Sequence, residues 1–361
     1  MKKTLALVLA AMMVASFTAC GGGAKDESSS AAPAPESSEG APAADASEIT
    51  VGACIYKFDD TFMTGVRNNM TTAADELGAT LEIVDSQNKQ PTQNEQVDTY
   101  ITKGVNALAV NPVDLTAAGP IIDKAKAEDI PIVLLNRQPS DEDMAKFDKA
   151  WYVGAKAEES GTMSGEIIAD YFKANEAADK NGDGKIQFVM LQGEPGHQDA
   201  TLRTEYSIKA LEDAGYEVEQ LGADTAMWDK VKATDLMKTF IAAHGLDQIE
   251  AVLANNDDMA LGAIEGLKAE GYNTGDESKF IPVVGVDATA PALAAMKDGS
   301  LLGTVLNDGE NQGIATINIA VAAAQGKEIS KETIGYDVTD EKYVWIPYVK
   351  VTAENYEQFG G

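Results

Sequence analysis

The chain has 361 residues, 44% of them hydrophobic, which is enough for about two domains of ~150 residues, each with a buried core. Lys and Arg total 28 and Asp and Glu total 58, so the formal net charge is −30. This charge argues against a nucleic-acid-binding face, which needs clustered basic residues, and it makes any single carboxylate weak support for a site.

Residues 1–20 are typical of a bacterial secretion signal, because two lysines precede an apolar run at residues 5–17. The run is shorter than the ~20 residues of a membrane-spanning helix. Small residues before Cys20 resemble a lipoprotein signal, in which Cys20 is lipidated and becomes the mature N-terminus; an ordinary signal peptide is the alternative. Residues 21–47 lack large apolar side chains, so we expect a flexible acidic tether.

From Ile49 onward, short apolar runs alternate with longer stretches of helical spacing. This alternation predicts an α/β fold with parallel sheets covered by helices on both faces, divided into two domains. Cys54 lies in the first run, so we expect an inert buried thiol, with no intramolecular disulfide and no zinc site. The nine predicted strands span residues 49–56, 80–85, 107–112, 131–136, 186–193, 216–222, 250–256, 281–287 and 301–307.

In the first predicted helix, five apolar side chains share one face before Gly78, which we expect at the C-cap. They are Met63, Val66, Met70, Ala74 and Leu77.

The stretch DKNGDGKIQ, residues 179–187, resembles the beginning of a calcium-binding EF-hand loop. Asp179, Asn181 and Asp183 alternate, and Gly184 permits a sharp turn. The twelfth position would be Met190, which cannot bind a hard cation. The stretch is a decayed calcium loop, a chance cluster of turn residues, or a site whose last ligand comes from elsewhere.

Polar residues recur where the predicted strands end, and this is the edge at which open α/β sheets bind ligands. Taken singly, each could be a helix N-cap, since Asn and Asp are favoured there. Their recurrence in both halves of the chain favours a site. They are Asp59, Asp60, Asn136, Asn255, Asn256, Asp287 and Asn307.

Seven segments together resemble the bacterial galactose/glucose-binding proteins, a periplasmic type of sugar-binding protein that serves ABC importers. The resemblance runs from about Val51 to the C-terminus, with blocks in matching order, and Arg137 stands where that family more often has Lys. The segments are YKFDDTFM, LNRQPS, GEPGHQDATLR, DTAMWD, ANND, GVDA and GTVLND.

The resemblance implies that Phe62 and Trp228 stack on opposite faces of a pyranose. It also implies that a set of polar side chains binds the hydroxyl rim, which suits carboxylates, amides and a guanidinium fork. Each aromatic residue could instead be core packing. The polar set is Asp60, Asn136, His197, Asp199, Arg203, Asn256, Asp287 and Asn307.

The resemblance further implies two lobes joined by three hinge crossovers, with ligand trapped by hinge closure. The N-terminal lobe would be 48–154 plus 308–345, and the C-terminal lobe 155–307 plus 346–361. It also completes the calcium loop with the Lys185 carbonyl, Gln187 and a remote bidentate Glu250, so that a structural Ca²⁺ would pin two strands of the second lobe.

We therefore expect a non-enzymatic solute-binding lipoprotein that is anchored to the outer face of the cytoplasmic membrane. It would lie on the cell surface in a Gram-positive type of bacterium and in the periplasm otherwise. It would capture D-galactose or D-glucose as a monomer and deliver it to ABC permease subunits. Presentation of the sugar to a chemoreceptor is the alternative. Glu194, His197 and Asp199 could suggest acid–base chemistry, but no recognised nucleophile or phosphate-loop motif accompanies them. A repressor would need a basic DNA-binding segment where the tether stands.

Overall fold

The computed structural model describes residues 49–360. The predicted signal, Cys20 and the tether lie outside the described residues. In the described part of the chain, no helix combines the length and the apolar character needed to cross a membrane.

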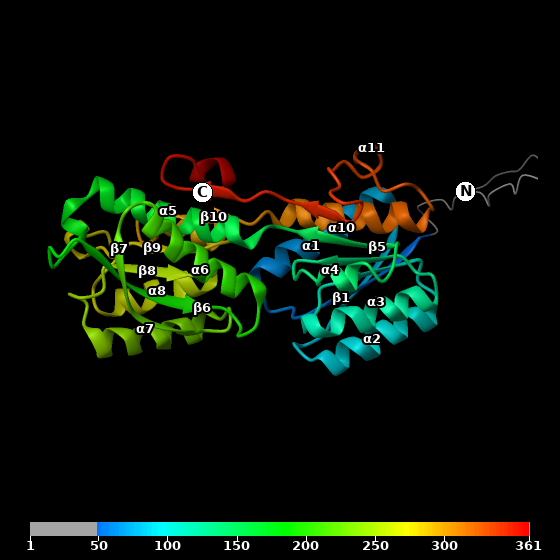
Figure 1. Cartoon of the computed structure of the whole chain (residues 1–361), viewed down its shortest axis with the longest axis horizontal. Coiled ribbons are helices and arrows are strands. Elements are labelled where there is room, and N and C mark those ends of the chain that lie inside the picture. Colours follow the sequence, from blue (N-terminus) through cyan, green and yellow to red (C-terminus); the bar gives the residue numbers. More distant parts are fainter. Residues whose placement is uncertain (1–48, 361) are drawn as a thin grey trace, which may run out of the picture. The chain divides into compact units, whose positions relative to one another are not determined.

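The first sheet has six parallel strands in the order β11-β5-β4-β3-β1-β2. We call this sheet and the helices that cover it the first lobe (Figure 1). Its strands are β1 (Thr50–Ile55), β2 (Thr80–Asp85), β3 (Ala107–Val110), β4 (Ile132–Leu135), β5 (Ala150–Gly154) and β11 (Tyr343–Trp345).

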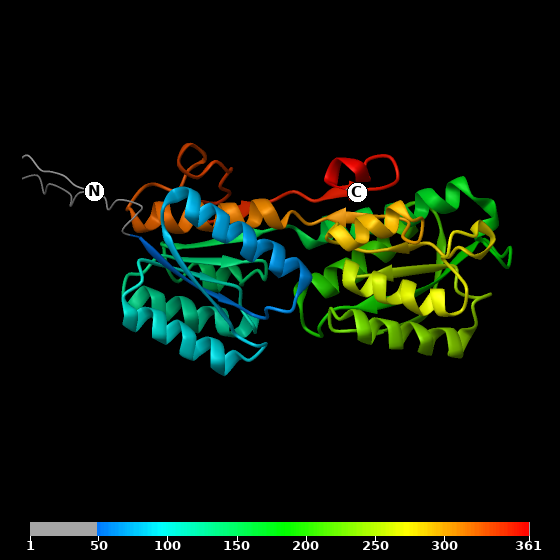
Figure 2. The same ribbon diagram turned by 180° about the vertical axis from the view of Figure 1, so that it is seen from behind.

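Helices cover both faces of the first sheet because side chains alternate along each strand. Along β1, Ala53 points into a core shared with α1 and α10, whereas Cys54 points into a second core shared with α2 and α3. Figure 2 shows α1 and α10 lying side by side on their face of the sheet. The helices are α1 (Thr61–Leu77), α2 (Gln90–Lys103), α3 (Ala118–Ala127), α4 (Asp141–Met144), α10 (Gly309–Ala324) and α11 (Lys331–Ile334).

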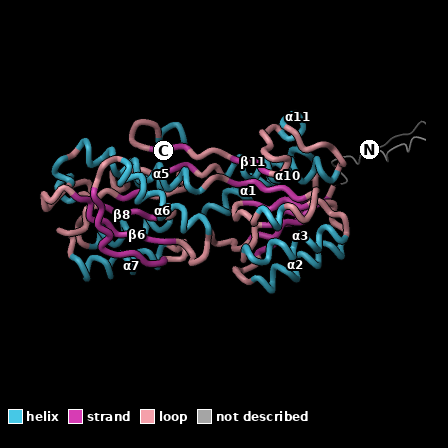
Figure 3. The backbone as a smooth tube through the Cα atoms, viewed as in Figure 1, coloured by secondary structure: helices cyan, strands magenta, loops and turns pink. Residues whose placement is uncertain are grey.

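The second sheet has four parallel strands in the order β7-β6-β8-β9, and it defines the second lobe (Figure 3). Its strands are β6 (Lys185–Gln192), β7 (Glu217–Thr225), β8 (Ala251–Ala254) and β9 (Val283–Val284). Helices α7 and α8 share one core with this sheet, and α5 and α6 share the other. These helices are α5 (Ala157–Ala174), α6 (Gln198–Asp213), α7 (Lys230–His244) and α8 (Asp257–Ala269), with the shorter α9 (Ala290–Lys297) following β9.

A short antiparallel pair completes the second lobe. Strand β10 (Thr304–Leu306) pairs with β12 (Val349–Val351), which follows directly after β11 of the first sheet. Single parallel bridges, such as Asp287 to Leu306, connect the β10 segment to the chain around β9. The chain passes between the two sheets after β5, after β10 and after β11.

The predicted α/β class is confirmed, and each of the nine predicted apolar runs contains a strand. Strands β5, β11 and β12 were not predicted. Residues 301–307 were expected in a parallel sheet. They form parallel bridges to the chain around β9, and β10 also pairs antiparallel with β12 because the returning C-terminal segment lies beside it. Leu77 is 38% exposed, since it lies in the last turn of α1, where the helix has left the core.

The two smaller predictions around β1 and α1 are confirmed. Cys54 is free and buried, and burial raises the pKa of its thiol to about 12, so the thiolate that reacts is not populated. Gly78 ends α1 in the left-handed region, at φ 70°.

Candidate functional site

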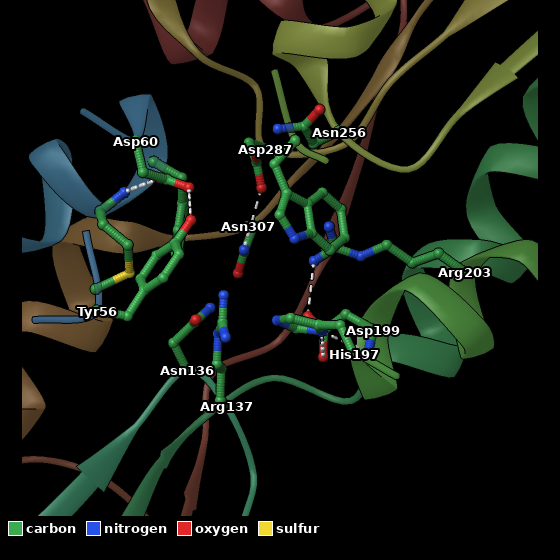
Figure 4. Close-up of a pocket in the computed structure, with 13 residues that line it drawn as sticks. Tyr56, Asp60, Asn136, Arg137, His197, Asp199, Arg203, Asn256, Asp287 and Asn307 are labelled. Atoms are coloured by element: carbon green, nitrogen blue, oxygen red, sulfur yellow. Dashed lines mark hydrogen bonds and ion pairs between the residues drawn. The ribbon is translucent and has the colours of Figure 1, made fainter. Parts of the chain in front are cut away.

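One pocket collects the polar residues that end the strands of both lobes, and Figure 4 shows their side chains converging on it. The empty space at this site, part of which is open to solvent, is about 360 Å³. All ten residues of the predicted sugar site line it. The complete lining is Tyr56, Asp60, Phe62, Met63, Asn136, Arg137, His197, Asp199, Arg203, Trp228, Asn256, Asp287 and Asn307.

The topology explains why residues so distant in sequence meet. Asp60 follows β1 and Asn136 follows β4 of the first sheet, whereas Asn256 follows β8 and Asp287 follows β9 of the second. Parallel strands present their carboxyl ends at one edge of a sheet, so both edges contribute to the same pocket.

Three of these residues are helix N-caps and also line the pocket. Asp60 accepts from the Met63 N–H at 2.7 Å, Asn256 from Met259 at 3.0 Å, and the His197 ring from Asp199 at 3.1 Å. The capping alternative and the ligand alternative are therefore compatible, because each cap uses only part of the side chain's hydrogen-bonding capacity.

The cap also defines which nitrogen of His197 carries the proton. Its Nδ1 is the acceptor from the Asp199 N–H, so the neutral ring must carry its hydrogen on Nε2. Burial lowers the pKa of His197 well below its ordinary value, and the nearby guanidinium groups of Arg137 and Arg203 lower it further. The ring is thus a neutral Nε2–H donor at physiological pH.

Arg203 organises the second-lobe side of the pocket. One terminal nitrogen donates to the Asn255 carbonyl at 2.8 Å; the other donates to Asp199 at 3.1 Å and to the Tyr348 hydroxyl at 3.0 Å. Among the described residues, its buried Nε–H has no partner. An unpaired buried donor costs free energy, so a ligand oxygen that reached it would gain from this arrangement.

Buried acids give the pocket its electrostatic character. Burial raises the pKa of Asp199, although the neighbouring Arg203 and Arg137 oppose this effect. Burial also raises the pKa of Asp287, and the nearby carboxylates of Asp257 and Asp60 raise it further. Asp287 accepts a hydrogen bond from the Asn307 amide at 3.2 Å.

The two aromatic residues predicted for stacking both line the pocket, one from each lobe. Phe62 is half-buried and also contacts the first-lobe core. Trp228 is 8% exposed, contacts the second-lobe core and adopts a left-handed backbone at φ 61°. The core-packing alternative is therefore compatible with the ligand alternative here too. Their roles toward a sugar remain predictions.

Three lining residues were missed by the sequence reasoning: Tyr56, Met63 and Arg137. Tyr56 and Met63 belong to the same YKFDDTFM block as Asp60, and Arg137 directly follows Asn136. Adjacency to predicted ligands was the available signal. It was not sufficient, because neighbours on a strand or loop usually point in different directions.

The predicted calcium loop lies between α5 and β6, after a short 3₁₀ turn at Glu176–Ala178. The Asp179 carboxylate accepts from the N–H groups of Gly182 at 2.7 Å and Gly184 at 2.9 Å. Both glycines have a positive φ, at 72° and 80°, which the sharp turn requires.

The remote Glu250 does lie beside this loop. Its carboxylate accepts from the N–H groups of Lys180 at 2.6 Å and Gln187 at 3.1 Å. Within residues 49–360, no group of three or more Asp, Glu, His or Cys side chains is gathered closely enough to hold a metal ion. The buried Oε1 of Gln187, however, has no hydrogen-bond partner among the described residues, and it is an oxygen of the kind that Ca²⁺ accepts.

Comparison with known proteins places these features in a family. Residues 51–328 match the model of the family described as "Periplasmic binding protein domain". The D-galactose/methyl-galactoside binding periplasmic protein MglB of Haemophilus influenzae is 44% identical over 315 residues, covering 87% of this chain and 92% of that protein. The putative rhizopine-binding protein of Rhizobium meliloti is 34% identical, covering 86% of this chain and 93% of that protein.

A solved structure shows the same fold. The ABC transporter solute binding protein from Bacillus halodurans with bound myo-inositol superimposes with a TM-score of 0.73 at 32% identity, covering 87% of this chain and 98% of that one.

Proposed function

The chain belongs to the periplasmic binding protein family, and from this premise we propose that it captures D-galactose or D-glucose outside the cytoplasmic membrane for an ABC importer. Members of this family bind solutes and do not catalyse reactions. One observation carries the proposal: all ten predicted ligand residues line the same pocket.

The pocket chemistry suits a pyranose better than an apolar or strongly charged ligand. A sugar ring has two C–H faces, which aromatic side chains can cover, and a rim of hydroxyls that both donate and accept. The lining offers aromatic rings at Phe62 and Trp228, donors at Arg203 and His197, and acceptors such as Asp287. Buried polar groups left unpaired are costly, so such a site favours ligands with hydroxyls at every matching position.

Binding would hold the lobes together because the ligand contacts both of them. Asp60, Phe62 and Asn136 come from the first lobe, and His197 and Trp228 come from the second. A ligand that contacts both lobes binds the closed form better than any open form and shifts the population toward it. The permease subunits of the importer can then distinguish loaded protein from empty protein.

Isothermal titration calorimetry on the mature protein tests the sugar. We expect heat on titration with D-galactose and with D-glucose, and much weaker binding of D-ribose. The 44% identity to a D-galactose/methyl-galactoside binding protein supports the hexose over the pentose. Heat with ribose alone, or with none of the three sugars, contradicts this specificity.

Lipidation at Cys20, which lies outside the described residues, would attach the protein to the outer face of the membrane. Metabolic labelling with a radioactive fatty acid tests this. We expect the wild-type protein to incorporate the label and Cys20→Ser not to incorporate it. A sugar-loaded form could also engage a chemoreceptor; transport is preferred here because the solved relative at 32% identity is an ABC transporter solute binding protein.

We also propose a structural Ca²⁺ at the 179–187 loop. The donor set fits this hard cation, since it consists of oxygens: the side chains of Asp179, Asn181, Asp183, Gln187 and Glu250, and the Lys185 carbonyl. The partnerless Oε1 of Gln187 supports the proposal. The bound ion would supply charge neutralisation and would tie the loop to the start of β8.

A further inference from the structure

Glu194 of the second lobe reaches across to two residues of the first. One carboxylate oxygen accepts from the Arg137 guanidinium at 2.8 Å, and the other accepts from the Asn88 amide at 3.1 Å. The side chains of Arg137 and Glu194 are only 5% and 13% exposed, so this pair is largely shielded from water and salt. Both oxygens of a second-lobe carboxylate are therefore occupied by first-lobe donors.

Arg137 is in turn fixed within its own lobe. It donates to the Val113 carbonyl at 2.6 Å, and its guanidinium carbon lies 4.0 Å from the centre of the Tyr56 ring. A planar guanidinium can stack on an aromatic face and bind a carboxylate at the same time, whereas a lysine ammonium is a point charge on a flexible stem. The arginine at this position thus joins Glu194 to Tyr56.

Tyr56 extends the connection to the pocket. Its ring is 2% exposed, and its hydroxyl donates to Oδ2 of Asp60. The other oxygen, Oδ1, accepts from the Met63 N–H at the start of α1. Both carboxylate oxygens of Asp60 are consequently held by hydrogen bonds. One of the two donors, Tyr56, is the residue on which the guanidinium of the interlobe ion pair stacks.

Resting on the proposed function, we propose that Arg137 and Tyr56 are positioning residues that orient Asp60 for the sugar, and that Glu194 locks this arrangement only when the lobes close. The contact of Glu194 with the first lobe acts on the equilibrium between the open and closed forms. When the lobes separate, Glu194 loses both first-lobe donors, and Arg137 loses its only acidic partner among the described residues. The contact therefore favours the closed form even before a ligand is considered.

Four single variants test this proposal against a matched control, and one of them, Arg137→Met, removes the guanidinium altogether. Glu194→Gln removes the charge, Arg137→Lys keeps the charge but not the fork, and Tyr56→Phe removes only the hydroxyl. The control is Glu217→Gln, which breaks a second-lobe ion pair with Lys185 of the same 2.8 Å length whose side chains are 34% and 71% exposed. Exposed pairs of this kind contribute little.

The expected affinity changes are measured by calorimetry with D-galactose. Glu194→Gln should weaken binding about 10-fold or more, mainly through faster dissociation, because a shielded charge pair loses one partner. Arg137→Lys should bind the sugar more tightly than Arg137→Met does, but less tightly than wild type. Arg137→Met and Glu194→Gln should be non-additive in the double variant, and Tyr56→Phe should weaken binding in a manner insensitive to salt. Additive effects, or wild-type affinity in Glu194→Gln, overturn the proposal.

A measurement without sugar separates this proposal from the sugar assignment. Fluorescent labels on Glu76→Cys and Glu212→Cys, one exposed position in each lobe, report interlobe distance by energy transfer in a Cys20→Ser background. The buried Cys54 should not react. We expect Glu194→Gln to shift the sugar-free population toward longer distances and Glu217→Gln to leave it unchanged. If wild type binds no hexose, the proposed function fails, but this shift still supports the lock. An unchanged distance distribution in Glu194→Gln overturns it.

Discussion

The rings of His197 and Trp228 meet nearly at right angles, with centroids 5.1 Å apart and an interplanar angle of 74°. One is the N-cap of α6, and the other lies in the strained turn before α7. Each ring therefore limits the positions open to the other, and the wall of the pocket on this side is fixed by backbone geometry and by ring packing together.

Gly193 should control the position of Trp228. A Cβ atom at this glycine would lie 2.1 Å from Cζ2 of the indole, so Gly193→Ala must displace the ring. Overpacking typically costs about 1–3 kcal/mol. We expect weaker D-galactose binding by calorimetry with the overall fold retained by circular dichroism. Gly65→Ala is the control, because nothing lies within 4 Å of its added Cβ. Equal affinity in the two variants would show that the indole position does not matter for binding.

Trp228 should be needed for sugar binding and should also contribute to stability. Trp228→Ala removes a ring that is 8% exposed, so a stability loss of about 3 kcal/mol or more is expected together with loss of most of the sugar affinity. Trp228→Phe keeps an aromatic face and should recover much of the stability and part of the affinity. Retained affinity in Trp228→Ala, measured by calorimetry, would mean that the indole is only core packing.

Acidification should destabilise the protein through His197. The pKa of His197 in the folded state lies below the ordinary value of about 6.5. Just below pH 6.5, the imidazole is therefore protonated in the unfolded chain but still neutral in the folded chain. Stability is unaffected above pH 7 and falls by up to about 1.4 kcal/mol per pH unit below 6.5. His197→Asn retains a capping acceptor but cannot titrate.

Thermal melts at pH 7.5 and pH 5.0 measure this difference. The gap in melting temperature between wild type and His197→Asn should narrow at the lower pH. A constant gap would show that the imidazole is not held neutral. The raised pKa values of Asp199 and Asp287 act in the opposite direction as pH falls, but both proteins share these residues, so the comparison isolates the histidine.

Calcium should stabilise the second lobe through Glu250. Wild type is expected to melt at a lower temperature after treatment with EGTA and to recover when CaCl₂ is restored. Glu250→Gln should melt at a lower temperature in calcium and should not respond to the chelator. Glu212→Gln, at an exposed position on α6, is the control and should respond as wild type does. If EGTA leaves the melting temperature of the wild-type protein unchanged, the proposed calcium site is wrong.

Removing the Tyr348 hydroxyl should loosen Arg203. In Tyr348→Phe the guanidinium loses an acceptor at 3.0 Å, and a buried hydrogen bond of this kind contributes about 1 kcal/mol. We expect a lower melting temperature and weaker hexose binding. Tyr206→Phe, on α6 but outside the pocket lining, should change neither. A loss of stability without loss of affinity would restrict Tyr348 to a structural role.

Strand positions in the fold were predictable because buried parallel strands read as continuous apolar runs, of which 131–136 is an example. Strands β11 and β12 have three residues each and were not predicted, whereas the similarly short β9 and β10 lie within longer apolar runs. The antiparallel pairing of β10 depends on where the C-terminal segment returns, which local sequence does not determine.

The candidate site divides in a similar way. Residue types that suit a sugar could be carried over from the resemblance, and the structure brings all ten into one pocket. The part played by Arg137 could not be predicted, because it depends on the placement of Glu194 and Tyr56, which are distant in sequence. Likewise, the backbone N–H groups that occupy Asp179 and Glu250 depend on the conformation of the loop and not on its composition.

Strand β11 pairs Tyr343 with Tyr152 at the edge of the first sheet, and β12 then pairs with β10 in the second. A ribosome delivers these two strands last, after every other strand has been made. Neither lobe can be completed until almost the whole polypeptide has emerged. A chain that finishes folding so late stays unfolded for longer, and this would suit a binding protein that acts outside the cytoplasm.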